Sequence, residues 1–244
     1  MRSIDERMGH AQALVGANDM DGARSVYQSI ADEVKEHCPS RLMLGILIME
    51  RGNFDSAKAH FEECPQIDPY YTQALYQLGR LNISMGHIDD AIGHFKQVIK
   101  LEPSHFEANI DLGNCLTNIG DYEGAIQRYS SAVKLEPKSV IAHFNIGTVA
   151  EQIGRFELAV THLEQTIKIN PEYVDAWNNL GLAKTTLGQS KEAEKAFLTA
   201  ISISPMFASP YTNLGILYKQ LGNYEKAEEF LHHSLQIDPK TAPA

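Results

Sequence analysis

The sequence predicts an all-α fold, a solenoid of like helix pairs, and the prediction rests on residues that recur at one period. Glycine, proline and alanine each return every 34 residues without an insertion. The glycines are Gly45, Gly79, Gly113, Gly147, Gly181 and Gly215, the prolines are Pro69, Pro103, Pro137, Pro171, Pro205 and Pro239, and the alanines are Ala57, Ala91, Ala125, Ala159, Ala193 and Ala227. Three residue types that share one period indicate a repeat array.

Each 34-residue unit has the pattern of a helix, a turn and a second helix. Trp177, Leu180 and Gly181 lie on one face of the first helix, and the glycine lets a neighbouring helix approach closely. Gly188 is expected to end that helix in the left-handed conformation. Pro205 is expected to stop the second helix, because proline has no N–H and clashes with the preceding turn.

The second helix begins with an acidic residue in most units, which suits the positive end of the helix dipole. These residues are Asp55, Asp89, Glu123, Glu157 and Glu225. Its inner face alternates small and large side chains, as Ala193, Phe197 and Ala200 show.

These residues resemble the tetratricopeptide repeat, whose pattern is W-x2-L-G-x2-Y, then A-x3-F, then P. The matching residues are Trp177, Leu180, Gly181, Ala193, Phe197 and Pro205. Lys184 departs at the tyrosine position, which Tyr218 restores in the last unit. The resemblance implies a right-handed superhelix of about seven units with a concave groove that holds extended peptides.

The period divides residues 1–244 into one array with no linker between its units. Six units are expected at 38–71, 72–105, 106–139, 140–173, 174–207 and 208–241. Residues 4–37 match poorly, since Lys35 replaces the proline, and they are interpreted as a degenerate first unit.

A polar residue precedes Leu-Gly or its equivalent at the sixth position of several units. In tetratricopeptide proteins this position faces the groove, together with the second, ninth and thirteenth. The candidate peptide-binding residues at and around these positions are Gln77, Arg80, Asp111, Asn114, Asn118, Asn145, Gln152, Asn178, Asn179, Asn213 and Gln220.

Asn145, Asn179 and Asn213 are the centre of this hypothesis. A side-chain amide offers a donor and an acceptor together, which matches a peptide bond. A row of amides on stacked helices would read the backbone of a bound segment about every third residue. The row resembles the asparagine ladder of O-linked N-acetylglucosamine transferases. Two alternatives stay open: polarity typical of a solvated groove in tetratricopeptide sequences, or a local role within the helix.

The charge of the chain limits the kinds of partner. A formal net charge of -10 and an isoelectric point near 5.4 argue against nucleic acid. The groove positions that hold a carboxylate clamp in chaperone-binding relatives carry Arg80 as their only basic residue. The other residues there are Glu107, Asp111, Ile141, Phe144, Asp175 and Thr212. We therefore expect a neutral or basic extended protein segment as partner.

The location and chemistry of the protein are predicted from what the sequence lacks. No apolar run of about 18–20 residues is present and the first ten residues have no signal-peptide core, so we expect a cytoplasmic protein without a membrane span. Cys38, Cys64 and Cys115 are interpreted as reduced thiols with structural roles.

No enzymatic motif, metal site or cofactor site is expected. His60, His94 and His162 share one position of the second helix, but equivalent atoms of successive units lie too far apart for one ion. They are interpreted as solvent-exposed. No phosphate-binding glycine loop and no nucleophile motif is present.

The C-terminal end is expected to expose an apolar face near Leu217, Leu221 and Leu231. This face offers a route to homo-oligomers. The sequence therefore favours a non-catalytic scaffold that binds an extended peptide. Two alternatives remain: the substrate-recruiting arm of a larger enzyme such as a glycosyltransferase, and a self-assembling structural scaffold.

Overall fold

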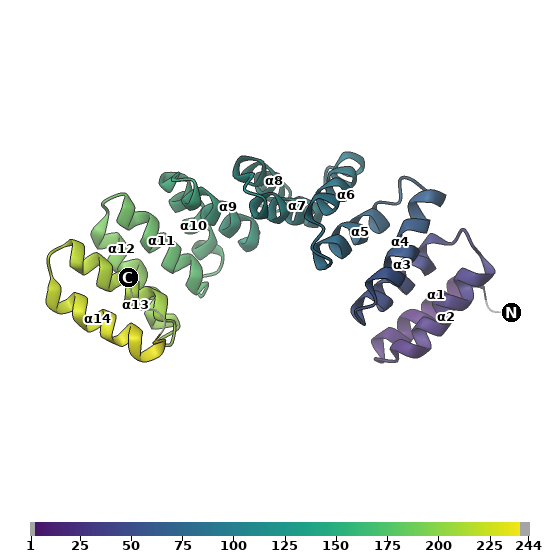
Figure 1. Cartoon of the computed structure of the whole chain (residues 1–244), viewed down its shortest axis with the longest axis horizontal. Helices are drawn as coiled ribbons and strands as arrows, with labels where there is room; N and C mark the ends of the chain where they lie inside the picture. The colour runs from purple at the N-terminus through teal and green to yellow at the C-terminus, as the bar shows by residue number, and fades with distance from the viewer. Residues whose placement is uncertain (1–2, 240–244) are drawn as a thin grey trace. The chain divides into compact units, whose positions relative to one another are not determined.

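The computed structural model describes residues 3–239, and these form fourteen helices and no strand (Figure 1). The predicted all-α solenoid of seven helix pairs is confirmed. The first helices of the pairs are α1 (Ile4–Gly16), α3 (Cys38–Glu50), α5 (Thr72–Ser84), α7 (Phe106–Asn118), α9 (Val140–Gln152), α11 (Val174–Thr186) and α13 (Ala208–Gln220). The second helices are α2 (Met20–Glu33), α4 (Phe54–Ile67), α6 (Ile88–Leu101), α8 (Tyr122–Leu135), α10 (Phe156–Ile169), α12 (Ser190–Ile203) and α14 (Tyr224–Ile237).

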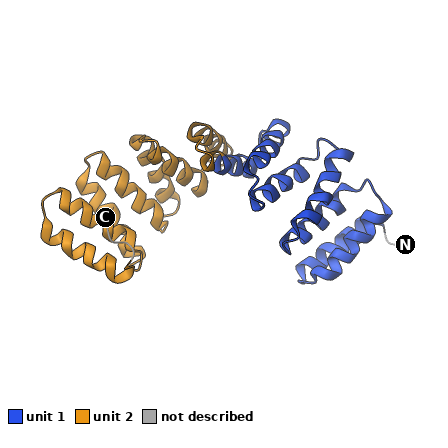
Figure 2. Ribbon diagram, in the orientation of Figure 1, with its two compact units in different colours: residues 1–115 blue, residues 116–244 orange. Residues whose placement is uncertain are grey.

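The chain divides into two compact units, residues 1–115 and residues 116–244, with the division inside α7 (Figure 2). From α1 to α6 and from α8 to α14, each helix packs against the next helix along the chain. The odd-numbered helices from α3 onward begin at the first residue of the repeat period.

The turn inside each pair needs a residue with positive φ. Six glycines at the predicted position have φ between 74° and 81°; they are Gly52, Gly86, Gly120, Gly154, Gly188 and Gly222. In the degenerate first pair Asn18 occupies this position with φ 61°. Asparagine tolerates the left-handed region better than most residues, so the turn survives without glycine.

The close approach predicted at Gly181 is confirmed. A Cβ atom added to Gly181 would lie 2.4 Å from the Cε1 atom of Phe197, and one added to Gly79 would lie 2.5 Å from that of Phe95. Both rings are fully buried. In these two pairs the helices therefore meet with the ring of the second helix against the bare backbone of the first.

The start of the second helix carries a signal that the sequence reasoning missed. The side chains of Asp19, Asn53, Asp121 and Asn223 each accept a hydrogen bond from a backbone N–H three residues later, at 2.9–3.3 Å. This is N-capping, which satisfies one of the free N–H groups of the first turn. The predicted acidic residues also lie in the first turns of these helices.

Proline is not required to end the second helix. The helices stop two residues before their prolines, as α12 does at Ile203 before Pro205. The first pair has Lys35 in that place, and α2 still ends at Glu33. The chain direction after the helix is thus set by the packing of the next pair as well as by proline.

One expectation about the C-terminal end is wrong. Leu217 was expected near an exposed face, but it is 1% exposed and packs with Phe197, Leu214 and Ala227. Its position on α13 faces the core between α12 and α14. Leu221 is 55% exposed and Leu231 is half-buried, so the apolar surface at this end belongs to these residues and to α14.

Candidate functional site

The predicted peptide-binding residues lie on the first helices but differ in exposure. Arg80, Asn114, Asn118, Gln152 and Gln220 are exposed. The five residues at the sixth position of their helices are half-buried: Gln77, Asp111, Asn145, Asn179 and Asn213. We call these five the polar row. Asn178, at the fifth position of α11, is buried and only 6% exposed.

In unit 2 the polar row is linked through Asn178. Nδ2 of Asn213 donates a hydrogen bond of 2.8 Å to Oδ1 of Asn178. Nδ2 of Asn178 in turn donates a bond of 3.3 Å to Oδ1 of Asn179. Asn179 and Asn213 therefore each have one amide atom in a hydrogen bond within the chain, with Asn178. The direct partner contact predicted for Asn178 stays a prediction.

The linked amides keep one donor and one acceptor for another molecule. In the described part of the chain, no hydrogen bond occupies Nδ2 of Asn179 or Oδ1 of Asn213. Neither atom is among the buried polar atoms that lack a partner, so both reach solvent. Asn114 and Asn145 also have interactions of their own within the chain.

In unit 1 the equivalent link joins a phenol and a carboxylate. The hydroxyl of Tyr76 donates a hydrogen bond of 2.9 Å to Oδ2 of Asp111. The Tyr76 ring also lies 4.8 Å from the ring of His105, centroid to centroid. Burial raises the pKa of Asp111, while the Tyr76 hydrogen bond and Arg80 act in the opposite direction. Burial likewise raises the pKa of Tyr76.

The two links share one geometry. Each joins the fifth position of one first helix to the sixth position of the next, 35 residues later. The residue before Leu-Gly thus lies at the seam between neighbouring first helices. A polar side chain there can bond its neighbour and still present its remaining atoms to the surface.

Comparison with repeat families decides what this array is. Models described as tetratricopeptide repeat match residues 73–105, 94–127, 174–205 and 208–241, and a model described as TPR repeat matches 113–154 and 151–188. Together they span most of the chain. The chain belongs to the tetratricopeptide repeat family.

Solved structures show the same tetratricopeptide architecture. A crystal structure of MamA is 29% identical with a TM-score of 0.64, covering 67% of this chain and 95% of that one. YrrB, described as a TPR protein with an unusual peptide-binding site, is 21% identical with a TM-score of 0.66, covering 74% and 93%. PilF of Pseudomonas aeruginosa is 18% identical with a TM-score of 0.67, covering 85% and 94%. At these identities, the likeness to YrrB and PilF shows a shared fold alone. No curated protein sequence matches this chain.

Glu151 is a residue of the tetratricopeptide surface that the sequence reasoning missed. It lies on α9 beside Gln152 and is half-buried, and burial raises the pKa of its carboxyl to about 7. No ion pair to Glu151 is found between residues 3 and 239. The sequence does single out Glu151, because no other unit from residue 38 onward has an acid at the equivalent position. The residues at that position are Met49, Ile83, Thr117, Thr185 and Lys219.

The interpretation of the shared histidine position as solvent-exposed is wrong. His60, His94 and His162 are half-buried, and burial lowers the pKa of each, that of His162 to about 4. Nδ1 of His162 lies 2.9 Å from Nδ1 of His143. His143 must donate from Nε2 to the carbonyl of Pro137, so in the neutral pair His162 donates and His143 accepts. The described residues contain no cluster of three possible metal ligands.

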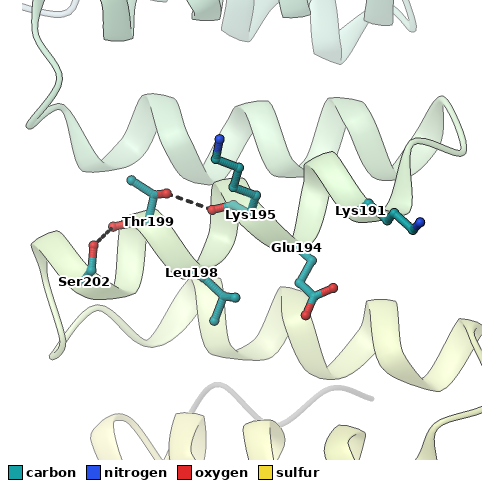
Figure 3. A pocket seen from close by; sticks show the side chains of 6 residues that line it. All are labelled: Lys191, Glu194, Lys195, Leu198, Thr199 and Ser202. Carbon is teal, nitrogen blue, oxygen red and sulfur yellow. Dashed lines mark hydrogen bonds between the residues drawn. The ribbon is translucent and has the colours of Figure 1, made fainter.

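The outer surface offers a weaker site. A shallow hollow of about 340 Å³ lies against α12, with Lys195 and Glu194 projecting to opposite sides of the helix (Figure 3). The hydroxyls of Thr199 and Ser202 already donate to backbone carbonyls of the same helix. The hollow therefore brings no converging polar groups together. None of the described helices is both long and apolar enough to cross a bilayer.

Proposed function

We propose that the chain is a non-catalytic scaffold that binds an extended protein segment through the asparagines of the polar row in unit 2, Asn145, Asn179 and Asn213. The observation that carries the proposal is the linked set Asn178, Asn179 and Asn213, which leaves one amide donor and one amide acceptor open to solvent. A peptide bond has the same two groups. Because the amides are held by one another, little side-chain freedom is lost when a segment binds.

The expected partner is neutral or basic. The half-buried carboxyl of Glu151 lies on α9, in the unit that contains the three asparagines, and a cation on the partner would favour its ionised form. The likeness of the asparagines to the ladder of O-linked N-acetylglucosamine transferases is part of this proposal, since a ladder reads backbone more than side chains. A role as the recruiting arm of a larger enzyme would use the same row.

Peptide selection from a random twelve-residue display library, followed by calorimetry with the full chain, tests the proposal. We expect micromolar ligands that lose affinity when single backbone nitrogens are N-methylated, and lose little in a side-chain alanine scan. The double substitution Asn179→Ala and Asn213→Ala should weaken binding by about tenfold or more, as loss of two hydrogen bonds predicts.

Gln165→Ala, an exposed amide on the second helix α10, is the matched control and should bind normally. Ligands whose affinity is the same for the double variant and the control would refute the assignment of the row. An acidic C-terminal chaperone peptide should not bind.

Self-association is the second candidate function, and the 55% exposure of Leu221 is the observation that favours it. Light scattering over a range of protein concentrations tests it. A monomer at every concentration would remove this candidate and leave the first intact.

A further inference from the structure

Glu151 is a half-buried acid on α9, and its carboxylate has no hydrogen bond or ion pair with any residue from 3 to 239. Burial alone raises the pKa of this carboxyl, so no neighbouring charge compensates for the solvent that it loses. Neither of its oxygens is among the fully buried polar atoms that lack a partner, so both reach solvent. A carboxylate in this state favours a cation from another molecule.

The direction of Glu151 follows from Phe144, which lies seven residues earlier on α9. Residues seven apart differ by only about 20° around a helix, so the two side chains leave α9 on the same face. The Phe144 ring lies 4.8 Å from the Tyr173 ring, centroid to centroid, and Tyr173 directly precedes α11. α9 and α11 also contact each other. Glu151 therefore lies along the seam between these two first helices.

The other end of this face is apolar. Phe144 and Tyr173 are half-buried, and Ile141 is 49% exposed. Ile141 precedes Phe144 by three residues, which makes the two neighbours on the helix surface. We call Ile141, Phe144, Glu151 and Tyr173 the α9 strip, and all four lie in unit 2. The strip thus has an apolar surface near the start of α9 and an acid near its end.

Asn179 lies on the other side of the same seam. In both links described above, the fifth position of a first helix meets the sixth position of the next. Phe144 and Asn179 hold these positions in α9 and α11. Side chains of neighbouring residues point to opposite sides of an extended segment. A segment held by Asn179 would therefore direct one side chain toward Ile141 and the next toward Glu151.

We propose that the α9 strip selects a partner segment in which an apolar residue is next to a lysine or arginine. The apolar side chain packs on Ile141 and Phe144, and the basic side chain donates to the carboxylate of Glu151. Seven residues span about 10 Å along a helix, so the cation needs a long side chain to reach the acid. Lysine and arginine meet this requirement better than histidine.

The inference rests on the proposed peptide-binding function and adds the pair of side chains that the scaffold selects. These two side chains are the exception to the small losses expected in an alanine scan of a bound segment.

The probe is a fluorescein-labelled nonapeptide of threonine with Leu-Lys-Leu at its centre and an amidated C-terminus. Threonine favours the extended conformation, and a leucine on each side of the lysine serves either chain direction. Binding to the full chain is followed by fluorescence anisotropy, and we expect high-micromolar affinity. Norleucine in place of lysine removes the charge and keeps the aliphatic chain, and it should weaken binding about tenfold.

Exchange of charge locates the cation. Glu151→Gln should make the lysine and norleucine probes bind equally. Glu151→Lys should weaken the lysine probe and favour a probe with glutamate at its centre, and misfolding cannot produce this reversal.

Glu228→Lys is the matched control, because Glu228 is an exposed acid on α14 and its replacement changes the net charge equally. It separates a local contact from the general attraction of cationic peptides to a chain of net charge -10. This variant should still prefer the lysine probe.

Ile141→Ser tests the apolar end of the strip. It should weaken the Leu-Lys-Leu probe about threefold or more and have little effect on an Ala-Lys-Ala probe, because leucine buries more apolar surface. Leu198→Ser is the control, since Leu198 is similarly exposed, at 42%, but lies on the second helix α12. Thermal melts of each variant check the fold.

Three outcomes would overturn the inference. The first is equal binding of the lysine and norleucine probes by the unmodified chain. If both probes then lose affinity on joint replacement of Asn179 and Asn213 by alanine, the peptide-binding function stands and only the selection by Glu151 fails. The second is a preference for lysine that persists in Glu151→Gln, because the cation would then lie elsewhere. The third, no binding of any probe at millimolar protein, would overturn this inference together with the proposed function.

Discussion

The side-chain amide of Asn213 donates a hydrogen bond of 2.8 Å to the amide oxygen of Asn178, which precedes it by 35 residues. Tyr76 and Asp111 are joined across the same offset at 2.9 Å. The polar residue before Leu-Gly therefore joins neighbouring first helices as well as facing the surface. Structural and binding roles coincide at one position, and they have to be separated by experiment.

Stability measurements separate the structural role of this position from its role in binding. Asn178→Ala should lower the free energy of unfolding by about 1–3 kcal/mol, because Asn178 is buried and its neighbours lose a partner. Asn213→Ala alone should cost less, since its side chain is only half-buried. The double-mutant cycle should give a coupling of about 0.5–1.5 kcal/mol, measured by denaturant unfolding of the full chain. A coupling of zero would mean that the hydrogen bond contributes nothing to the joint.

The packing of glycine against phenylalanine makes a second prediction. Gly181→Ala should destabilise the chain by about 1–3 kcal/mol, because the new Cβ would lie 2.4 Å from a fully buried ring. Gly93→Ala is the control: Gly93 is exposed within α6, and an added Cβ meets nothing within 4 Å. It should stabilise the chain by up to about 1 kcal/mol, as replacement of a helical glycine usually does. Equal melting temperatures for the two variants would contradict this account.

Glu151 predicts a loss of stability at high pH. Its pKa is raised from 4.5 to about 7 in the folded chain, so folding favours the protonated form. That stabilisation is complete below pH 4.5 and is lost as the pH rises through about 7. Glu151→Gln should therefore raise the melting temperature at pH 8, by the equivalent of about 1–3 kcal/mol, and change little at pH 4.5.

The exposed Glu172→Gln is the matched control for this pH dependence. It should have the same small effect at both pH values. A Glu151→Gln variant that is no more stable than the parent at pH 8 would show that the carboxyl is well solvated.

The histidine pair predicts the opposite trend. The pKa of His162 is lowered from 6.5 to about 4, so folding favours the neutral ring. Its stabilising contribution is present above pH 6.5 and is lost as the pH falls toward 4. His162→Asn should flatten the fall in melting temperature between pH 7 and pH 4.5, whereas substitution of the exposed His10 should not. An unchanged slope would contradict the burial of this ring.

The structural features that could be predicted from the sequence are those that repeat from unit to unit. The period and the glycine at each turn recur in six units, so the pattern itself exposes them. The glycine of the first helix meets phenylalanine at Gly45, Gly79 and Gly181, and leucine at Gly147 and Gly215. The pairing of His143 with His162 and the partial burial of Glu151 occur once each. Glu151 can be noticed as an acid at a position where the other units have none. Its burial and the histidine contact depend on the side chains that lie opposite, which the period does not specify.

The polar row was predictable in part. Its positions follow from the helical face, and those residues do lie on the first helices. The burial of Asn178 does not follow, because the fifth position lies at a seam whose width is set by the packing of neighbouring helices. The prediction that Leu217 is exposed was wrong for a related reason. A core position on the first helix of the last pair is still covered by the second helix of the same pair.

The cysteines provide the last prediction. Cys38 and Cys64 are 26 residues apart, yet each thiol lies within hydrogen-bonding distance of the other residue's backbone carbonyl, at 3.8 and 3.6 Å. All three cysteines are buried as free thiols, and burial raises the pKa of Cys64 to about 12 and that of Cys115 to about 11. Thiolate is the reactive form, so the native chain should react with a disulfide reagent such as DTNB only as fast as it opens. Denatured chain should release three equivalents at once, in line with its three cysteines. A native thiol that reacts within seconds at pH 8 would show that one of these helix pairs opens far more readily than its packing implies.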